Sequence, residues 1–298
     1  MIFNKAERKR AKLRLAIAGV SGSGKTTAAL QIARGLGGKT AVIDTENGSS
    51  SLYSDRFDFD VLELDAPYTP ERFIEAIEAA EKAGYDTVII DSMSHEWVGS
   101  GGCLEINDTL AKTKYKGNSF AAWNEAGLRH RRFLEKIVTS KIHLITTVRM
   151  KAEHVQEGKK VSKVGMKYEM RDDFEYEFTT VFNIAHEGHY AVVSKDRTAI
   201  YDDTPFLITP ETGVELDQWL NSGKNYYMDD EQVAELNRLV GSLPSETQLK
   251  IHSKYPNFAE EPDARFDEIE AGLKGMIEKM VIARQQQSDI QENQQQTA

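Results

Sequence analysis

The chain has very little cysteine and no long hydrophobic run. Cys103 is the single cysteine among 298 residues, which excludes an internal disulfide framework and fits a reducing, cytoplasmic environment. No apolar run reaches the length of a membrane span, and no hydrophobic stretch follows the basic N-terminus. We therefore expect neither a transmembrane helix nor a signal peptide. Hydrophobic residues still make up 40% of the sequence, enough for one large α/β core and a smaller appendage.

The chain also lacks an overall basic charge, because its net charge is −10. From Asp229 onward there are 14 acidic and 7 basic side chains, a balance of −7, which leaves −3 for the first 228 residues. The field that a ligand experiences is set by nearby charges, so the overall acidity does not exclude nucleic acid. The basic segments contain Lys5, Arg8, Lys9, Arg10, Lys12 and Arg14, then Arg129, Arg131 and Arg132, then Lys159, Lys160, Lys163 and Lys167.

Strand and helix patterns alternate along the first half of the chain. Apolar runs predict strands at 13–18, 40–44, 59–64, 87–91 and 142–148. Helices are predicted at 26–36, at 119–139 and between Thr69 and Gly84. Strands separated by helices predict an α/β fold with a mostly parallel sheet flanked by helices. In such a sheet ligands bind at the carboxyl ends of the strands.

The pattern changes beyond residue 148. A polar stretch with lysines and glycines at 150–173 predicts a loop, and short β-like segments follow as far as 208. A helical pattern covers 229–283, and the Gln-rich end predicts disorder. We expect four regions: a basic N-terminal segment at 1–12, an α/β core at 13–222, a small acidic helical region at 223–284 and a disordered tail at 285–298.

The segment Gly19-Val-Ser-Gly-Ser-Gly-Lys25-Thr26 matches the P-loop spacing G-x-x-x-x-G-K-[ST] at every fixed position. Its glycines let backbone N–H groups surround phosphate oxygens, and the helix N-terminus that follows favours negative charge. Lys25 would contact the β- and γ-phosphates of ATP, and the Thr26 hydroxyl would coordinate Mg²⁺. A chance match is disfavoured, because an apolar strand precedes the segment and a helix follows it. The expected nucleotide-binding residues are Gly19, Ser21, Gly22, Ser23, Gly24, Lys25, Thr26 and Thr27.

Two carboxylates follow predicted strands. Asp91 ends the strand at 87–91 and is expected to hold Mg²⁺ together with Thr26, mainly through water. The alternative is an aspartate that caps the next turn. Glu46 follows the strand at 40–44, where a carboxylate could activate the attacking water. From spacing alone, a polar residue that starts a loop is an equal alternative.

The sequence resembles the RecA-type recombinase core across about 190 residues, from 13 to 205. Besides the P-loop, four matches occur in order: Ile43-Asp44-Thr45-Glu46, Asp91-Ser92, Val148-Arg149-Met150-Lys151 and Lys195-Asp196-Arg197. The resemblance implies that Glu46 activates water. It also implies that Lys195 and Arg197 reach the ATP of a neighbouring subunit, and therefore that the chain forms a homo-oligomer.

The compact core and the segment 171–178 are closer to the phage AAA-family nucleotide-binding proteins, some of which are RecA-like single-strand annealing proteins. This similarity implies a phage or prophage origin, and thus a bacterial host cytoplasm. It further implies single-stranded DNA as the ligand and a single-stranded-DNA-binding protein as a partner. The sequence departs from RecA at Thr147, where RecA has a glutamine that senses the γ-phosphate, and only residues 1–12 precede the first strand. These departures leave DNA coupling and filament formation open.

The polar stretch at 150–173 occupies the place of a RecA DNA-binding loop. Cations bind backbone phosphates, and aromatic rings stack on unpaired bases. The alternative is a solvated surface loop followed by an ordinary aromatic strand. The basic N-terminus is a second region that could contact DNA. The expected DNA-contacting residues are Lys159, Lys160, Lys163, Lys167 and Tyr168.

Other residues show no pattern that indicates chemistry. Cys103 is expected to be a small apolar filler, and Phe120 and Trp123 are expected to face the core from a helix. Structural or surface roles are expected for residues without metal-ligand spacing, namely His95, Trp97, His130 and His143.

The predicted function is ATP hydrolysis coupled to single-stranded DNA, in annealing or homologous recombination. Glu46 would act as the base, Lys25 and Mg²⁺ would neutralise developing charge, and Lys195 and Arg197 of a neighbouring subunit would complete the site. Hydrolysis by the isolated monomer should therefore be slow. The alternatives are a helicase loader, a packaging or replication-associated ATPase, a nucleotide-gated DNA-binding module and a small-molecule kinase.

Overall fold

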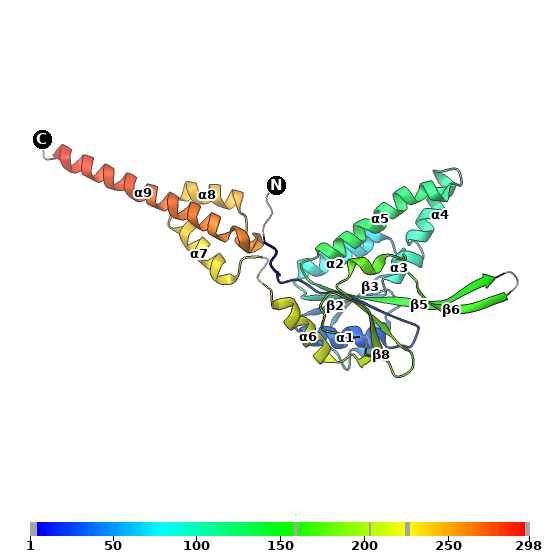
Figure 1. Cartoon of the computed structure of the whole chain (residues 1–298). Coiled ribbons are helices and arrows are strands. Elements are labelled where there is room, and N and C mark those ends of the chain that lie inside the picture. The colour runs from blue at the N-terminus through cyan, green and yellow to red at the C-terminus, as the bar shows by residue number, and fades with distance from the viewer. Residues whose placement is uncertain (1–4, 158–159, 203, 224–226, 296–298) are drawn as a thin grey trace. The chain divides into compact units, whose positions relative to one another are not determined.

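The computed structural model describes residues 5–157, 160–202, 204–223 and 227–295 (Figure 1). The chain divides into two compact units. One runs from Lys12 to Leu220, and the other combines the described residues before it with those that follow it. Among the described residues, no helix has both the length and the apolar character needed to span a bilayer.

The larger unit is built around one mixed sheet. Its strands are β1 (Arg14–Gly19), β2 (Thr40–Asp44), β3 (Asp60–Glu63), β4 (Thr87–Asp91), β5 (His143–Glu157), β6 (Lys160–Tyr168), β7 (Thr180–Ile184), β8 (Tyr190–Asp196) and β9 (Phe206–Leu207). Its helices are α1 (Lys25–Leu36), α2 (Pro70–Ala83), α3 (Ser94–Val98), α4 (Cys103–Thr113), α5 (Ser119–Thr139) and α6 (Pro210–Asn221), with 3₁₀ turns η1 (Ser49–Tyr53) and η2 (Phe174–Glu177).

The strand order is β3-β2-β4-β5-β1-β7-β8-β9, and β6 pairs with β5 outside this path. The pairings from β3 to β7 are parallel, whereas β8 and β9 continue the sheet antiparallel. The predicted α/β fold with a mostly parallel sheet flanked by helices is thus confirmed. One strand, β5, separates β1 from β4, so the P-loop and Asp91 lie on either side of it.

The central strands are buried on both faces because helices cover each side of the sheet (Figure 1). Alternate residues of a strand point to opposite faces, and β1 shows this directly. Ala16 and Ala18 join the cluster under α2 and α5, and Leu15 and Ile17 join the cluster under α1 and α6. This burial on both faces explains the continuous apolar runs in the sequence.

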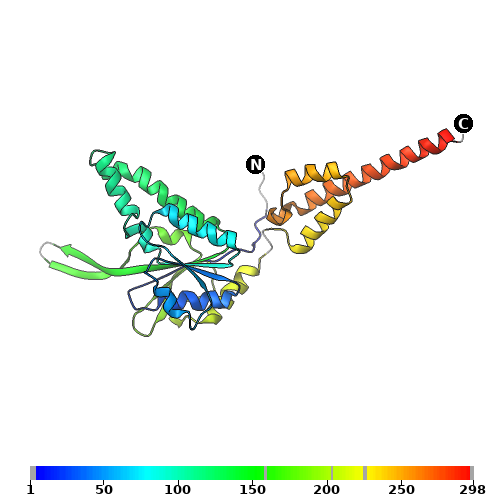
Figure 2. The ribbon, with the colours of Figure 1, turned by 180° about the vertical axis from the view of Figure 1, so that it is seen from behind.

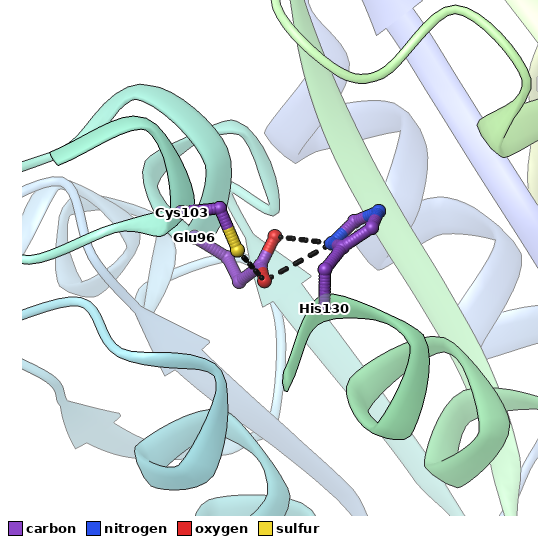
Figure 3. A group of neighbouring side chains, drawn as sticks. All are labelled: Glu96, Cys103 and His130. Atoms are coloured by element: carbon purple, nitrogen blue, oxygen red, sulfur yellow. Dashed lines mark hydrogen bonds and ion pairs between the residues drawn. The ribbon is translucent and has the colours of Figure 1, made fainter. Parts of the chain in front are cut away.

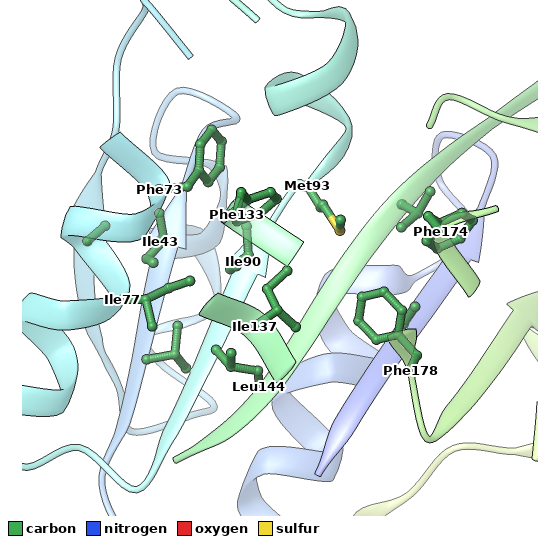
Figure 4. Packing of buried hydrophobic residues seen from close by; sticks show 14 of the residues in the cluster. Ile43, Phe73, Ile77, Ile90, Met93, Phe133, Ile137, Leu144, Phe174 and Phe178 are labelled. Atoms are coloured by element: carbon green, nitrogen blue, oxygen red, sulfur yellow. The ribbon is translucent and has the colours of Figure 1, made fainter. Parts of the chain in front are cut away.

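Aromatic and aliphatic side chains fill the cluster beneath α2 and α5 (Figure 4). Phe73 of α2 and Phe133 of α5 are fully buried, and their ring centroids lie 5.4 Å apart. Each such side chain contributes about 1.5–3 kcal/mol relative to exposure. Phe120, at the start of α5, is 88% exposed, so the expectation that it faces the core was wrong. Trp123 stacks on Trp97 with a centroid distance of 5.5 Å.

The predicted loop at 150–173 is instead mostly a β-hairpin. β5 continues to Glu157, and β6 returns beside it to Tyr168, so the pair extends beyond the sheet (Figures 1 and 2). The aromatic strand expected after it is the 3₁₀ turn η2. A two-stranded ribbon needs no buried face and can carry polar residues throughout, which explains why its sequence is typical of a loop.

The C-terminal part of the second unit is helical, with α7 (Asp230–Gly241), α8 (Ser245–Lys254), η3 (Phe258–Glu260), η4 (Asp263–Arg265) and α9 (Phe266–Gln295). Asp229 and Gln232 form a reciprocal capping box at the start of α7. Leu236, Leu273 and neighbouring apolar residues form its core. The tail predicted to be disordered from 285 continues α9 as far as Gln295. Gln, Glu and Ala are good helix formers, so this composition is compatible with a helix.

Candidate functional site

The P-loop connects β1 to α1 at the carboxyl edge of the sheet. Gly22 and Gly24 have φ angles of 76° and 91°, a left-handed conformation that glycine adopts without strain. Gly24 is the N-cap of α1, and in the part of the chain that the structure describes no side chain caps this helix end. This backbone conformation, followed by a helix N-terminus, is suited to holding phosphate.

The side chains of the P-loop agree with that role. A Cβ on Gly19 would collide with Ser23 Oγ and lie 3.0 Å from the Ile184 carbonyl oxygen, so this position favours glycine. Ser23 Oγ is buried and has no hydrogen-bond partner among the described residues. Ser21 is exposed, and Thr27 is half-buried in the first turn of α1. The loop therefore combines an exposed outer surface with an unpaired hydroxyl inside.

Lys25 lies close to two carboxylates. Its Nζ donates to the Val20 carbonyl at 3.0 Å. Burial lowers the pKa of the Lys25 ammonium, Asp91 and Glu46 oppose this effect, and the Arg149 charge adds to it. Lys25 follows β1, Glu46 follows β2 and Asp91 ends β4, while Arg149 pairs in register with Gly19, so two cations and two carboxylates lie at this edge of the sheet.

Asp91 is 2% exposed and accepts a hydroxyl on each oxygen. Thr26 Oγ1 donates to Oδ2 at 2.6 Å, and Thr147 Oγ1 donates to Oδ1 at 2.5 Å. Burial raises the pKa of the Asp91 carboxyl, while both hydroxyl bonds oppose that increase. Thr26 and Asp91 are oxygen donors beside the P-loop, which fits Mg²⁺. There the ion would neutralise phosphate charge.

A buried aspartate, Asp44, holds the backbone of Glu46 in place. Asp44 is 1% exposed and accepts from the Glu46 backbone N–H at 2.6 Å. It also accepts from the backbone N–H and hydroxyl of Ser50, at 2.8 and 2.5 Å. These bonds fix the turn between β2 and η1, so Asp44 is structural and Glu46 is carried at the edge of the sheet.

Glu46 forms an ion pair with Arg149. Arg149 Nε and Nη2 lie 2.9 and 2.8 Å from Glu46 Oε1. The Arg149 side chain is 36% exposed and the Glu46 side chain is 28% exposed, so solvent reaches the ion pair. Sequence reasoning used Arg149 solely as part of a resemblance. The two residues are 103 positions apart, so no local spacing reveals their contact.

A second group that sequence reasoning missed lies behind Glu46. Thr45 Oγ1 accepts from the Ser92 N–H at 2.8 Å and lies 2.7 Å from His95 Nδ1. The His95 ring stacks on Tyr68, with a centroid distance of 4.9 Å. Burial, followed by the Arg149 charge, lowers the pKa of His95. His95 was expected to be structural or at the surface, and it connects the strand ends that carry Glu46 and Asp91.

Lys195 and Arg197 lie away from the P-loop of their own chain. Asp196, between them, pairs with Thr180 at the start of β7, whereas Gly19 of the P-loop pairs with Ile184 at its end. Lys195 Nζ donates to the Glu175 and Tyr176 carbonyls at 2.6 and 2.9 Å. Arg197 Nη2 donates to the Tyr176 carbonyl at 3.0 Å. Both side chains therefore hold η2 within this chain.

The expected DNA-contacting residues are distributed along the hairpin. Lys159 lies outside the described residues, and Lys160 and Lys163 belong to β6. Lys167 pairs with Asp172 at 2.8 Å. The Tyr168 hydroxyl lies 3.0 Å from both Glu175 Oε1 and Asn183 Oδ1, and its ring packs edge-on against Phe174. Tyr168 is thus partly held by the core.

Basic residues near the N-terminus connect the start of β1 to the start of β5. Arg14 is 7% exposed, and its Nη1 donates to the Leu13 and Ile142 carbonyls at 2.8 Å. Burial lowers the pKa of Arg14 to about 10. Lys12 Nζ lies 3.3 Å from His143 Nε2. These side chains brace the start of β1 against β5.

A separate polar cluster lies inside the helical layer (Figure 3). The Cys103 thiol donates to Glu96 Oε1 at 3.0 Å, and His130 Nδ1 lies 3.0 Å from Glu96 Oε2. All three residues are at most 1% exposed. A carboxylate oxygen, the thiol sulfur and an imidazole nitrogen, the atoms that could bind a metal ion, lie within 4.8 Å of one another. Burial raises the pKa of the Cys103 thiol, which keeps it a hydrogen-bond donor. Cys103 is therefore not simply a filler: the network joins α3, α4 and α5.

Comparisons with known proteins show the family of the chain. A family model described as "AAA domain" matches residues 11–206, about two thirds of the chain. No curated protein matches the sequence. Among solved structures, the crystal structure of the RadB recombinase is similar: it is 19% identical, with a TM-score of 0.40, over 68% of this chain and 90% of that chain. The chain therefore belongs to the AAA domain family of nucleotide-binding P-loop ATPases.

Proposed function

We propose that this chain hydrolyses ATP and couples hydrolysis to single-stranded DNA, in annealing or homologous recombination. The observation that carries the proposal is the arrangement at the carboxyl edge of the sheet. Lys25 follows β1, Glu46 follows β2 and Asp91 ends β4. A phosphate-binding cation, a water-activating carboxylate and a metal-positioning carboxylate are the parts that phosphoryl transfer to water requires.

The proposed chemistry assigns one task to each group. Water loses a proton to the Glu46 carboxylate as its oxygen attacks the γ-phosphorus, and ADP leaves with the bridging oxygen. Lys25 and the P-loop N–H groups balance the charge that develops on the phosphates. Lys195 and Arg197 of a neighbouring subunit supply further cations. Their place at the opposite edge of the sheet from their own P-loop supports a role between subunits.

The hairpin supports single-stranded DNA as the ligand. A cavity of about 280 Å³ lies at its base. Lys151, Lys167 and Arg171 line it beside Trp97 and Tyr168, together with Glu169 and Asp172, which pair with Lys151 and Lys167. Cations beside aromatic rings suit a nucleic-acid strand, because phosphates pair with the charges and bases stack on the rings, at about 1–3 kcal/mol per base. The implied phage origin and single-stranded-DNA-binding partner belong to the same proposal.

The test is ATP hydrolysis by wild type and Glu46→Gln, with and without single-stranded DNA, at low and high protein concentration. We expect DNA and high concentration to stimulate the wild type, and the variant to bind ATP but lose turnover. An annealing assay with two complementary oligonucleotides then separates annealing from other tasks.

Each other outcome indicates a different function. Stimulation by DNA without annealing would favour a helicase loader, a packaging motor or a replication-associated ATPase. Turnover unchanged in Glu46→Gln would favour a nucleotide-gated binding module. Full activity at concentrations where the protein is monomeric would contradict a site completed by a neighbouring subunit.

A further inference from the structure

Arg149 is a basic residue beside the P-loop to which the proposed chemistry gives no task. It lies on β5, and its Cα pairs in register with Gly19, the first residue of the P-loop. Its backbone N–H donates to Ser94 Oγ at 2.9 Å, which fixes the main chain at this position. The guanidinium can therefore reach the phosphate-binding space from within the same subunit.

The charges around Arg149 indicate an anion-binding space. Its Cα pairs with that of Gly19 at the end of β1, and Lys25 begins α1 directly after the P-loop, so the two cations lie at the same edge of the sheet. Like charges in one space are unfavourable unless an anion lies between them, and Glu46 offsets that repulsion for Arg149. A triphosphate would satisfy both cations at once.

We propose that Arg149 contacts the γ-phosphate of ATP bound in its own subunit, and that this contact releases Glu46 to meet the attacking water. The proposal rests on the ATPase function proposed above and adds a residue that distinguishes ATP from ADP. With ADP, Arg149 keeps its pair with Glu46. With ATP, it exchanges the carboxylate for the phosphate.

The geometry favours such an exchange. Both members of the pair are partly exposed, and exposed ion pairs contribute little to stability. A γ-phosphate carries more charge than a carboxylate and suits the planar guanidinium. The hydroxyl of Thr147, on the same strand, is already engaged by Asp91. Arg149 is two residues further along β5, where its side chain can contact the phosphate instead.

The first experiment compares the affinities of a non-hydrolysable ATP analogue and of ADP, with Mg²⁺, for wild type, Arg149→Ala and Arg149→Lys. Losing a charge-assisted contact should weaken analogue binding by about 10- to 100-fold in Arg149→Ala. ADP affinity should stay within about two-fold, and Arg149→Lys should be intermediate. Arg132→Ala removes an exposed arginine on α5 and is the control that should change neither affinity.

A second experiment begins with a variant that leaves Arg149 in place. Glu46→Gln removes the competitor for Arg149, so it should tighten analogue binding by about two- to five-fold and leave ADP unchanged. The double variant with Arg149→Ala should lose that gain. Melting curves establish which variants are folded.

The outcomes separate the two proposals. If wild type binds neither nucleotide, the ATPase proposal and this inference both fail. If wild type binds and hydrolyses ATP while Arg149→Ala changes both affinities equally or neither, the ATPase proposal stands and the role of Arg149 is wrong. Unchanged analogue binding in Glu46→Gln would also overturn the exchange.

Discussion

Two carboxylates at the same edge of the sheet are held in opposite ways. Asp91 is 2% exposed, and Thr26 and Thr147 each donate a hydroxyl to it. The Glu46 side chain is 28% exposed and pairs with the guanidinium of Arg149. The first carboxylate is part of the core, and the second is accessible to water.

The difference separates two tasks. A group that positions a metal should not move, and burial with complete hydrogen bonding fixes a carboxylate. A group that activates water must remain accessible to water. Such a group is better held by an exposed ion pair, because its partner can move to another anion. Changes around Asp91 should therefore affect both stability and turnover, whereas changes at Glu46 should affect turnover with little effect on stability.

The largest effect is expected for Asp91→Asn. The amide keeps the shape but loses the charge that positions Mg²⁺, so turnover should fall by about 100-fold or more. Steady-state hydrolysis over a Mg²⁺ titration measures this loss. Asp108→Asn changes an exposed aspartate on α4 and should leave hydrolysis unchanged. Equal losses in the two variants would contradict the assignment of Asp91.

The second-largest effect is expected for Thr147→Val, which should lower the free energy of unfolding by about 1–3 kcal/mol. Valine keeps the shape of threonine but leaves one Asp91 oxygen buried without its donor. Urea denaturation measures the loss, and Thr147→Ser should recover most of it. If valine costs nothing, the hydroxyl does not hold Asp91.

A pH series without Mg²⁺ tests the burial of Asp91. Because burial raises its pKa above the ordinary 3.8, the folded state binds the proton more tightly than the unfolded state. The stability that this proton contributes is complete below 3.8 and is lost as the pH rises through the folded value. The unfolding free energy of wild type relative to Asp91→Asn should therefore decrease as pH rises. A constant difference would show that Asp91 is not desolvated.

The smallest effect is expected for the stability of Glu46→Gln. An exposed ion pair contributes up to about 1 kcal/mol, so the variant should unfold within that margin of wild type. Urea denaturation in the absence of nucleotide is the measurement. A loss of several kcal/mol would mean that Glu46 is structural, and the contrast with Asp91 would disappear.

Patterns of neighbouring residues predicted those helices and strands whose bounds depend on the same residues. The strands at 40–44 and 87–91 and the helix at 119–139 have the predicted bounds. Their apolar runs are buried, and glycine or polar residues end them. The P-loop was predictable for the same reason, since its glycines, lysine and threonine are adjacent in sequence. The roles assigned to its residues remain predictions.

The remaining features depend on contacts between distant residues. Glu96 and His130 are 34 positions apart, and no spacing rule indicates that a buried carboxylate and a buried imidazole meet. The hairpin was missed because it lies outside the core, where the alternation of apolar and polar residues is not required. Phe120 has the composition of a core residue but starts a helix at the surface.

β5 has different neighbours along its length. Its first part lies between β1 and β4, and its second part pairs with β6, with a register shift between Glu153 and His154. From Arg149 to Glu157 an extended strand rises by about 26 Å. An extended strand lengthens little when it is pulled along its axis. A pull on the hairpin would therefore be transmitted along β5 to Thr147 and Arg149. A load on the hairpin therefore reaches the phosphate-binding edge along the covalent backbone.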